Sequence, residues 1–264
     1  MHATHDVTWD ELRRHVSTFE PPLDGYGLPL RVYWRGQRGA TWDLVSAFDR
    51  MAEARLAAAG QAREQEIQRL RGLRDRIRID FRERLIGASE IRQSDLQAQP
   101  QYTWAIGRHF GLLTPVLDWS ETPNVALFFA IRDFCRERRD QDGTVRLRGN
   151  DAVALFRLVN QPGVAEGGLN IERARIDGLP RLVAQRGAFT IMEGDFEFTC
   201  VAKHLAARGK DAALTKFVLT GGSQLLRALH DMSASGIDYR TLFPDQEGAA
   251  LAANALAERI EVGD

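Results

Sequence analysis

The chain has 264 residues, of which 44% are hydrophobic and 27% charged, and its formal net charge is −1. This length fits one large domain, or a domain with helical additions, and can bury a core without cross-links. The balanced charge excludes an overall field that recruits nucleic acid or an anionic membrane and leaves only a local basic patch open. No apolar run approaches the roughly 18 residues of a membrane span. No targeting segment is visible either, so we expect a cytoplasmic protein without a membrane partner.

Familiar metal and nucleotide motifs are missing from the sequence. Cys135 and Cys200 stand far apart, which predicts two buried thiols in a reducing compartment, and the His residues lack paired ligand spacing, so we predict no metal site. The sequence also has no P-loop, no Gly-x-Gly-x-x-Gly and no Gly-x-Ser-x-Gly motif.

The first elements along the chain are a helix, a strand and a long helical segment. Thr8 and Glu11 have the spacing of a capping box, which predicts a helix start. Residues 30–34 alternate and are rich in β-branched and aromatic side chains, which predicts a strand. Residues 43–89 lack proline and repeat apolar residues at helical spacing, which predicts two helices broken near Gly60.

The second of these helices carries a basic run over residues 69–84. Asp75, Asp80 and Glu83 interleave with the arginines, which favours a solvated helix face. A stripe that binds nucleic acid is the open alternative.

The second half of the chain alternates short strands and helices. The pattern predicts a helix over 101–111, a short strand or extended loop over 112–117, a turn at Asp118-Trp119-Ser120, and a helix entered at Pro123 and buried nearly all round. Further expected elements are a surface hairpin or disordered tip at 136–149, strands at 152–159, 187–191 and 215–219, and helices at 222–233 and 246–260. The sequence therefore predicts a single mixed α+β domain. We divide it into an N-terminal helix and lead-in (1–29), a main domain (30–250, with a helical insertion over 43–100) and a C-terminal helix end (251–264).

Three clusters combine glycine, aromatic and polar residues at predicted strand ends or helix starts: 33–37, 109–130 and 181–189. Polar side chains at such positions can face a cleft, and those flanked by large apolar residues need polar partners. We therefore expect Arg35, His109, Asp118 and Gln185 to converge in one composite pocket, with Arg35 and Asp118 paired.

The same clusters resemble the FRG domain, a family named for an aromatic-Arg-Gly motif. That motif corresponds to Trp34-Arg35-Gly36, followed by Gln37. The second family block is matched by His109, Gly111, Leu112, Thr114, Leu117, Asp118, Trp119, Ser120, Pro123, Ala126, Phe128, Phe129 and Ala130. The third is matched by Arg181, Gln185, Gly187 and Phe189, and residues 236–245 also look like the family. In two places the sequence departs from the pattern, because Leu113 replaces the usual proline and Pro115 the usual arginine.

This resemblance implies a fold and a function. FRG domains occur in bacterial genomes and prophages, some in settings linked to phage defence or toxicity. Their motif order is similar to that of ADP-ribosyltransferases, whose α+β core consists of small twisted sheets. The implied function is an NAD-binding site of a toxin or defence effector, acting as an ADP-ribosyltransferase or NAD glycohydrolase on an unidentified macromolecular target. The alternative is a non-catalytic module that binds a nucleotide or macromolecule.

Under the first reading, the residues expected to act in catalysis are Arg35, His109, Ser120, Gln185 and Glu193. The residues expected to contact NAD as a substrate are Trp34, Gly36, Gln37, Asp118, Trp119 and Arg181. Gln185 can donate hydrogen bonds but supplies no negative charge, so Glu193 or Glu197 would have to provide the carboxylate.

Structural alternatives stay open for each of these residues. Arg35 holds a phosphate or ribose, or pairs with a buried Asp. His109 is a general acid or base, or a His bonded to backbone. Asp118 or Ser120 contributes to the site or caps the helix that Pro123 enters. The remaining alternatives place Trp119 in the core, Glu193 on an exposed strand and Arg181 at the surface.

Overall fold

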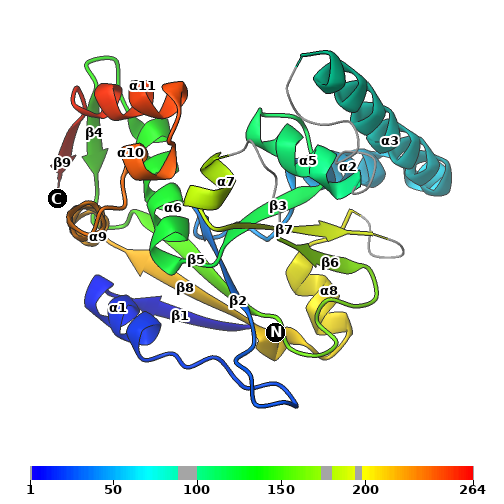
Figure 1. Ribbon diagram of the computed structural model, residues 1–264, viewed down its shortest axis with the longest axis horizontal. Coiled ribbons are helices and arrows are strands. Elements are labelled where there is room, and N and C mark those ends of the chain that lie inside the picture. Colours follow the sequence, from blue (N-terminus) through cyan, green and yellow to red (C-terminus); the bar gives the residue numbers. More distant parts are fainter. Residues whose placement is uncertain (1, 89–99, 174–179, 194–197, 264) are drawn as a thin grey trace.

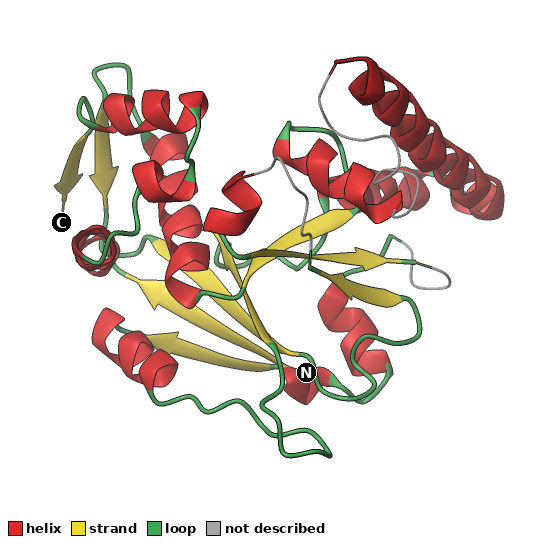
Figure 2. Cartoon of the chain, viewed as in Figure 1, coloured by secondary structure: helices red, strands yellow, loops and turns green. Residues whose placement is uncertain are grey.

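The structure is a computed structural model that describes residues 2–88, 100–173, 180–193 and 198–263. A seven-stranded sheet with the order β1-β8-β5-β2-β3-β7-β6 forms its centre, and β4 and β9 form a second, two-stranded sheet. Helices pack against both sheets (Figures 1 and 2), so the predicted α+β class is confirmed. The strands are β1 Ala3–Val7, β2 Val32–Gln37, β3 Val116–Ser120, β4 Thr144–Leu147, β5 Ala152–Val159, β6 Leu169–Glu172, β7 Gly187–Met192, β8 Leu214–Thr220 and β9 Arg259–Val262.

The helices pack on both faces of the large sheet. They are α1 Trp9–Ser17, α2 Ala47–Ala58, α3 Arg63–Ala88, α5 Pro100–His109, α6 Pro123–Arg138, α7 Pro180–Ala184, α8 Val201–Ala207, α9 Gly222–Ala234, α10 Tyr239–Leu242 and α11 Gln246–Ala255, with 3-10 turns at Gly60–Ala62 and Asp211–Ala213. α1, α6 and α9 bury one apolar cluster with Trp34 and Phe217, whereas α8 buries another on the opposite face with Tyr33 and Trp119. Alternate residues of β2 thus serve two different cores.

The helical insertion packs at the β3–β7–β6 end of the sheet. α2 and α3 are separated at Gly60, whose φ of 51° suits glycine, so the predicted break is confirmed. α3 and α5 share an apolar cluster with β3 and β7, and α3 extends away from the sheet (Figure 1). Residues 89–99 of the expected insertion lie outside the described residues.

Several local predictions are confirmed. Thr8 and Glu11 form the reciprocal capping box at the start of α1. Pro123 occupies the first turn of α6, where its missing N–H costs no helical hydrogen bond. Thr122 is the N-cap residue of α6, so the alternative in which Asp118 or Ser120 caps this helix is wrong.

Other predictions are corrected. Residues 118–120 belong to β3 rather than to a turn, because each pairs with a residue of β7. The surface hairpin expected at 136–149 is confirmed only for its turn, where Arg139 and Val145 form an antiparallel bridge; the rest of this range is the end of α6 and β4. The closing helix ends at Ala255, before β9. The sequence did not indicate β1, because this edge strand buries only its last residue and shows no alternation. It did not indicate β6 either.

Candidate functional site

β2 and β3 diverge beside α6, and a cavity of about 200 Å³ lies at this divergence. The two strands pair at Trp34 and Ser120, whereas β2 pairs with β5 along its full length. Arg35 and Gly36 of β2 therefore lie beside an opening in the sheet. The cavity is lined by Trp34, Arg35, Gly36, Arg108, Asp118, Trp119, Ser120, Ala126, Phe129, Asp133 and Gln185.

Arg35 is a partly buried cation of this cavity, with 16% of its side chain exposed. Its Nη1 donates a hydrogen bond of 2.6 Å to the backbone carbonyl of Asp118 and lies 3.8 Å from the Asp118 carboxylate. Its Nε is buried and has no hydrogen-bond partner among the described residues. Burial lowers the pKa of Arg35 to about 10, and Asp118 opposes this shift, so the guanidinium stays charged at neutral pH. Arg35 is thus a cation with unused hydrogen-bonding capacity facing a cavity.

The Asp118 carboxylate is shared by two arginines. Arg108, in the last turn of α5, donates from Nε to Asp118 Oδ2 at 2.7 Å. The expected Arg35–Asp118 pair therefore exists as the longer of two contacts. The carboxylate of Asp118 raises the pKa of Arg108 despite its burial. Because Arg108 holds Asp118, the replacement of the family arginine by Pro115 does not leave this carboxylate unpaired.

A second cavity of about 340 Å³ adjoins the first. The two share Arg108, Asp118, Trp119, Phe129 and Gln185 in their walls, so the Arg108–Asp118 ion pair lies between them. His109 lines the second cavity, with its ring edge-on to Phe110 at 4.9 Å between centroids. Desolvation lowers the pKa of His109, and Arg181 adds to this effect, so His109 is neutral at pH 7. The predicted convergence therefore holds for Arg35, Asp118 and Gln185 in one cavity, with His109 in its neighbour.

Helix α6 supplies a wall that the sequence analysis missed. Ala126, Phe129 and Asp133 line the first cavity, and Arg136 lines the second. Their spacing places them on one face of the helix. This spacing was visible in the sequence, but the dense apolar content of 125–131 led to the expectation of burial all round. Arg108 was missed because one arginine in a helical turn forms no pattern by itself.

Ser120 and Gln185 lie at the cavity, but backbone groups engage their polar atoms. The Ser120 hydroxyl donates to the Gln185 carbonyl at 2.7 Å and accepts from the Thr122 N–H at 3.0 Å. The Gln185 side-chain amide donates to the Leu242 carbonyl at 3.0 Å. These bonds connect β3, α7 and α10, which indicates that both side chains hold the wall of the cavity together.

Arg181 makes a different set of contacts. Its guanidinium donates two hydrogen bonds to Asp245 and one to Glu247, at 2.8 Å for the latter, and lies over the ring of Phe243. Only 8% of its side chain is exposed. Arg181 lines the second cavity, but its charge is already paired across α7 and the start of α11.

Glu193 does not join this site. It follows β7, accepts a hydrogen bond of 2.7 Å from Asn170, and lines a separate pocket with residues of α3 and β6. β7 is 6 residues long and places Gly187 beside Ser120, so Glu193 lies a strand length away, roughly 20 Å. Glu197 lies outside the described residues.

The other side chains expected to contact NAD pack against, or donate hydrogen bonds to, groups of the protein itself. Trp34 is 4% exposed and packs on Phe217. Trp119 is 3% exposed and donates from its indole N–H to Thr190. The Gln37 side-chain amide donates to the Asp43 carbonyl at 3.2 Å, away from the cavity lining.

Gly36 allows close packing of α6 on β2. A Cβ atom at Gly36 would lie 1.9 Å from the Ala126 carbonyl oxygen and 2.8 Å from Ala130 Cβ. Its contact is therefore with a helix of this chain, as well as with the cavity that it lines.

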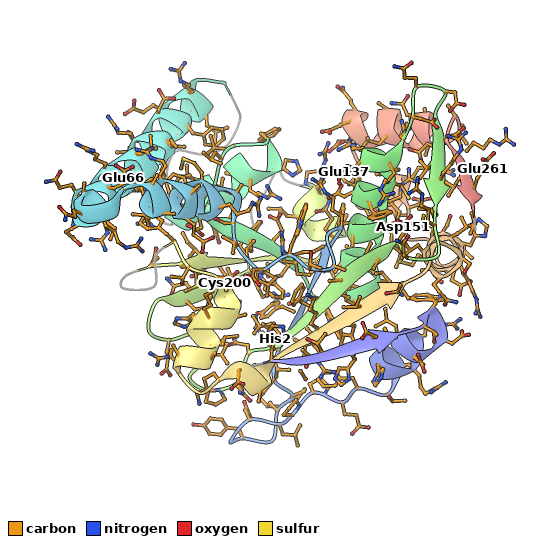
Figure 3. The ribbon with its side chains drawn as sticks, turned by 180° about the vertical axis from the view of Figure 1, so that it is seen from behind. His2, Glu66, Glu137, Asp151, Cys200 and Glu261 are labelled. Atoms are coloured by element: carbon orange, nitrogen blue, oxygen red, sulfur yellow. The ribbon has the colours of Figure 1, made fainter. Side chains whose placement is uncertain are left out.

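Arg69, Arg78 and Arg84 of the basic run on α3 form ion pairs with acidic neighbours. Glu66, labelled in Figure 3, contacts Arg55 and Arg69, and Arg78 and Arg84 contact Asp75 and Asp80. These pairs favour the solvated face over a nucleic-acid stripe. Within the described ranges, no three His, Cys, Asp or Glu side chains gather as a metal site, and no helix is long and apolar enough to cross a membrane.

Comparison with known proteins gives one family match. The family model described as FRG domain matches residues 30–139. No curated protein and no solved structure matches the chain. The matched segment runs from β2 to α6 and contains Arg35, Arg108, Asp118 and Asp133, whereas Gln185 lies outside it. The part of the chain that builds the charged walls of the first cavity is therefore similar to the FRG domain.

Proposed function

We propose that the cavity between β2, β3 and α6 binds a phosphate-bearing nucleotide, and that NAD is the first ligand to test. The observation that carries this proposal is Arg35, which lines the cavity, keeps 16% of its side chain exposed and donates to one backbone carbonyl among the described residues. Arginine binds phosphate through its fork of N–H groups, and a phosphate in the cavity would meet the exposed part of this fork.

The rest of the cavity supports the same ligand class. Arg108 provides a second guanidinium, and Phe129 provides an apolar wall. The two adjoining cavities, about 200 and 340 Å³, together match the size of pockets that hold nucleotide-sized molecules. NAD is chosen among nucleotides because Arg35 on β2, Ser120 on β3 and Gln185 shortly before β7 follow the order that the ADP-ribosyltransferase resemblance implies.

Binding is better supported than the catalytic arrangement expected from the sequence. Cleavage of NAD passes through an oxocarbenium-like state that a carboxylate stabilises, but Gln185 is neutral and Glu193 lies in another pocket. A toxin or phage-defence role would require such consumption of NAD. Mass spectrometry of the binding samples detects released nicotinamide and so measures this activity directly.

The binding proposal is tested by calorimetric titration with NAD and with pyrophosphate. We expect both to bind the wild type, and Arg35→Ala to weaken both by about 10- to 100-fold, the value of one or two charge-assisted hydrogen bonds. Arg38→Ala is the matched control, because Arg38 is close in sequence, pairs with Glu137 and does not line the cavity. Absence of binding by the wild type, or equal losses in the two variants, would contradict the proposal.

A further inference from the structure

The first cavity contains a carboxylate that the arginines do not neutralise directly. Asp133 lies on α6 one turn after Phe129 and lines the same cavity as Arg35 and Arg108. Among the described residues, no Lys, Arg or His nitrogen lies within 4.0 Å of its oxygens, and no hydrogen bond to it is formed. Asp118, the other acidic residue of the lining, is in contact with both arginines.

The arginines around Asp133 lie beyond ion-pair distance and act on it through their charge. Desolvation raises the pKa of Asp133, while Arg136 on its own helix and Arg38, Arg108 and Arg35 on other elements oppose the shift. Asp133 is nevertheless exposed to solvent, so water hydrates its carboxylate. A ligand in the cavity would displace some of this water, and hydroxyl groups of that ligand would then have to replace the lost hydrogen bonds.

We infer that Asp133 is the ribose-recognising residue of the site, which accepts hydrogen bonds from the vicinal hydroxyls of a nucleotide while Arg35 and Arg108 hold its phosphate. This inference rests on the proposed nucleotide binding. An inorganic phosphate or a simple organic anion would meet only repulsion from Asp133. A ligand that carries both an anion and a pair of hydroxyl donors satisfies both walls of the cavity at once.

The inference makes predictions of opposite sign for two probes. Asp133→Asn removes a negative charge from the cavity and leaves a side chain of the same shape. Pyrophosphate, which has no ribose, should bind this variant as tightly as the wild type or more tightly. ADP should bind about tenfold or more weakly, because a hydrogen bond to a charged acceptor is lost.

A third probe isolates the hydroxyls. The wild type should bind 2′,3′-dideoxy-ADP more weakly than ADP by a similar factor, and Asp133→Asn should bind the two equally. Glu137→Gln is the matched control. Glu137, labelled in Figure 3, lies on the same helix one turn further on, carries the same charge and does not line the cavity. This variant should keep the wild-type preference for ADP, which separates recognition from a general change in field.

The outcomes distinguish this inference from the proposal that it rests on. If the wild type binds pyrophosphate but treats ADP and its dideoxy analogue alike, or if Asp133→Asn keeps the wild-type preference, the anion site stands and the role of Asp133 is overturned. If the wild type binds none of the three probes, both are overturned. Far-ultraviolet circular dichroism of the variants confirms that each is folded, which we expect because the Asp133 side chain forms no internal hydrogen bond among the described residues.

Discussion

Arg35 lines the first of the two adjoining cavities and Arg181 lines the second, and these two arginines differ in what they contact. Arg181 donates to two carboxylates and lies over an aromatic ring, so its charge is used within the protein. Arg35 donates to one backbone carbonyl, lies 3.8 Å from a carboxylate, and keeps a buried Nε without a partner among the described residues. The comparison teaches that burial alone does not say whether the donors of an arginine are used within the protein. The number of satisfied donors does, and on this criterion Arg35 is the arginine that the proposed function assigns to a ligand.

The largest effect on stability is expected at Arg181. Arg181→Met keeps an apolar stem but removes the hydrogen bonds to Asp245 and Glu247, so the free energy of unfolding should fall by about 2–3 kcal/mol. Urea denaturation at pH 7 measures this loss. The hydrogen bond from Arg181 lowers the pKa of Asp245, so the wild type loses this contribution as the pH falls below about 4 and Asp245 takes up a proton. A cost that stays constant down to pH 3 would contradict this assignment.

Gly36→Ala tests the close packing of α6 on β2, which forms one wall of the first cavity. The new methyl group would meet the Ala126 carbonyl, a backbone atom that cannot rotate away, so α6 must shift. We expect a loss of about 1–3 kcal/mol in the free energy of unfolding. Phe129 and Asp133 would move with the helix, so pyrophosphate affinity should fall as well. Gly72→Ala is the control, because a Cβ there meets nothing within 4 Å and its helix favours alanine. Equal stability of the two variants would show that close packing does not explain Gly36.

Arg35→Met makes the comparison with Arg181→Met direct. The same substitution removes a guanidinium that is incompletely paired and desolvated, so the free energy of unfolding should change by no more than about 1 kcal/mol. Pyrophosphate binding should weaken by about 10- to 100-fold in Arg35→Met and be retained in Arg181→Met, measured well below the unfolding midpoint of each. A reversal of this order, with Arg35 the more stabilising residue, would make Arg35 a structural arginine.

The sequence predicted the meeting of Arg35, Asp118 and Gln185 from expected places at strand ends or helix starts, but the structure brings them together in another way. Arg35 and Asp118 lie within β2 and β3, where these strands diverge, and Gln185 lies shortly before β7. The sequence did not predict Arg108 or Asp133, because a single charged residue on a helix gains meaning only when the helix is placed. Glu193 was chosen for its charge alone, and the length of β7 carries it away from the cavity.

The smallest expected effect is on the pH dependence of stability, through the pKa of His109 and the charge of Arg181, two residues that line the second cavity. Desolvation is the main cause of the lowered pKa of His109, and the charge of Arg181 is the next. The folded state therefore favours the neutral imidazole, and this contribution to stability is complete above the unfolded pKa of about 6.5. This contribution is lost as the pH falls from there through the lower pKa of the folded state.

His109→Gln cannot titrate, so its free energy of unfolding should decline less than that of the wild type between pH 7 and pH 5. Urea denaturation at each pH measures this decline. The same substitution in an Arg181→Met background should change the slope of stability against pH by less, because the charge of Arg181 no longer acts on His109. Identical slopes for the wild type and His109→Gln would show that this imidazole is as well solvated as in the unfolded chain.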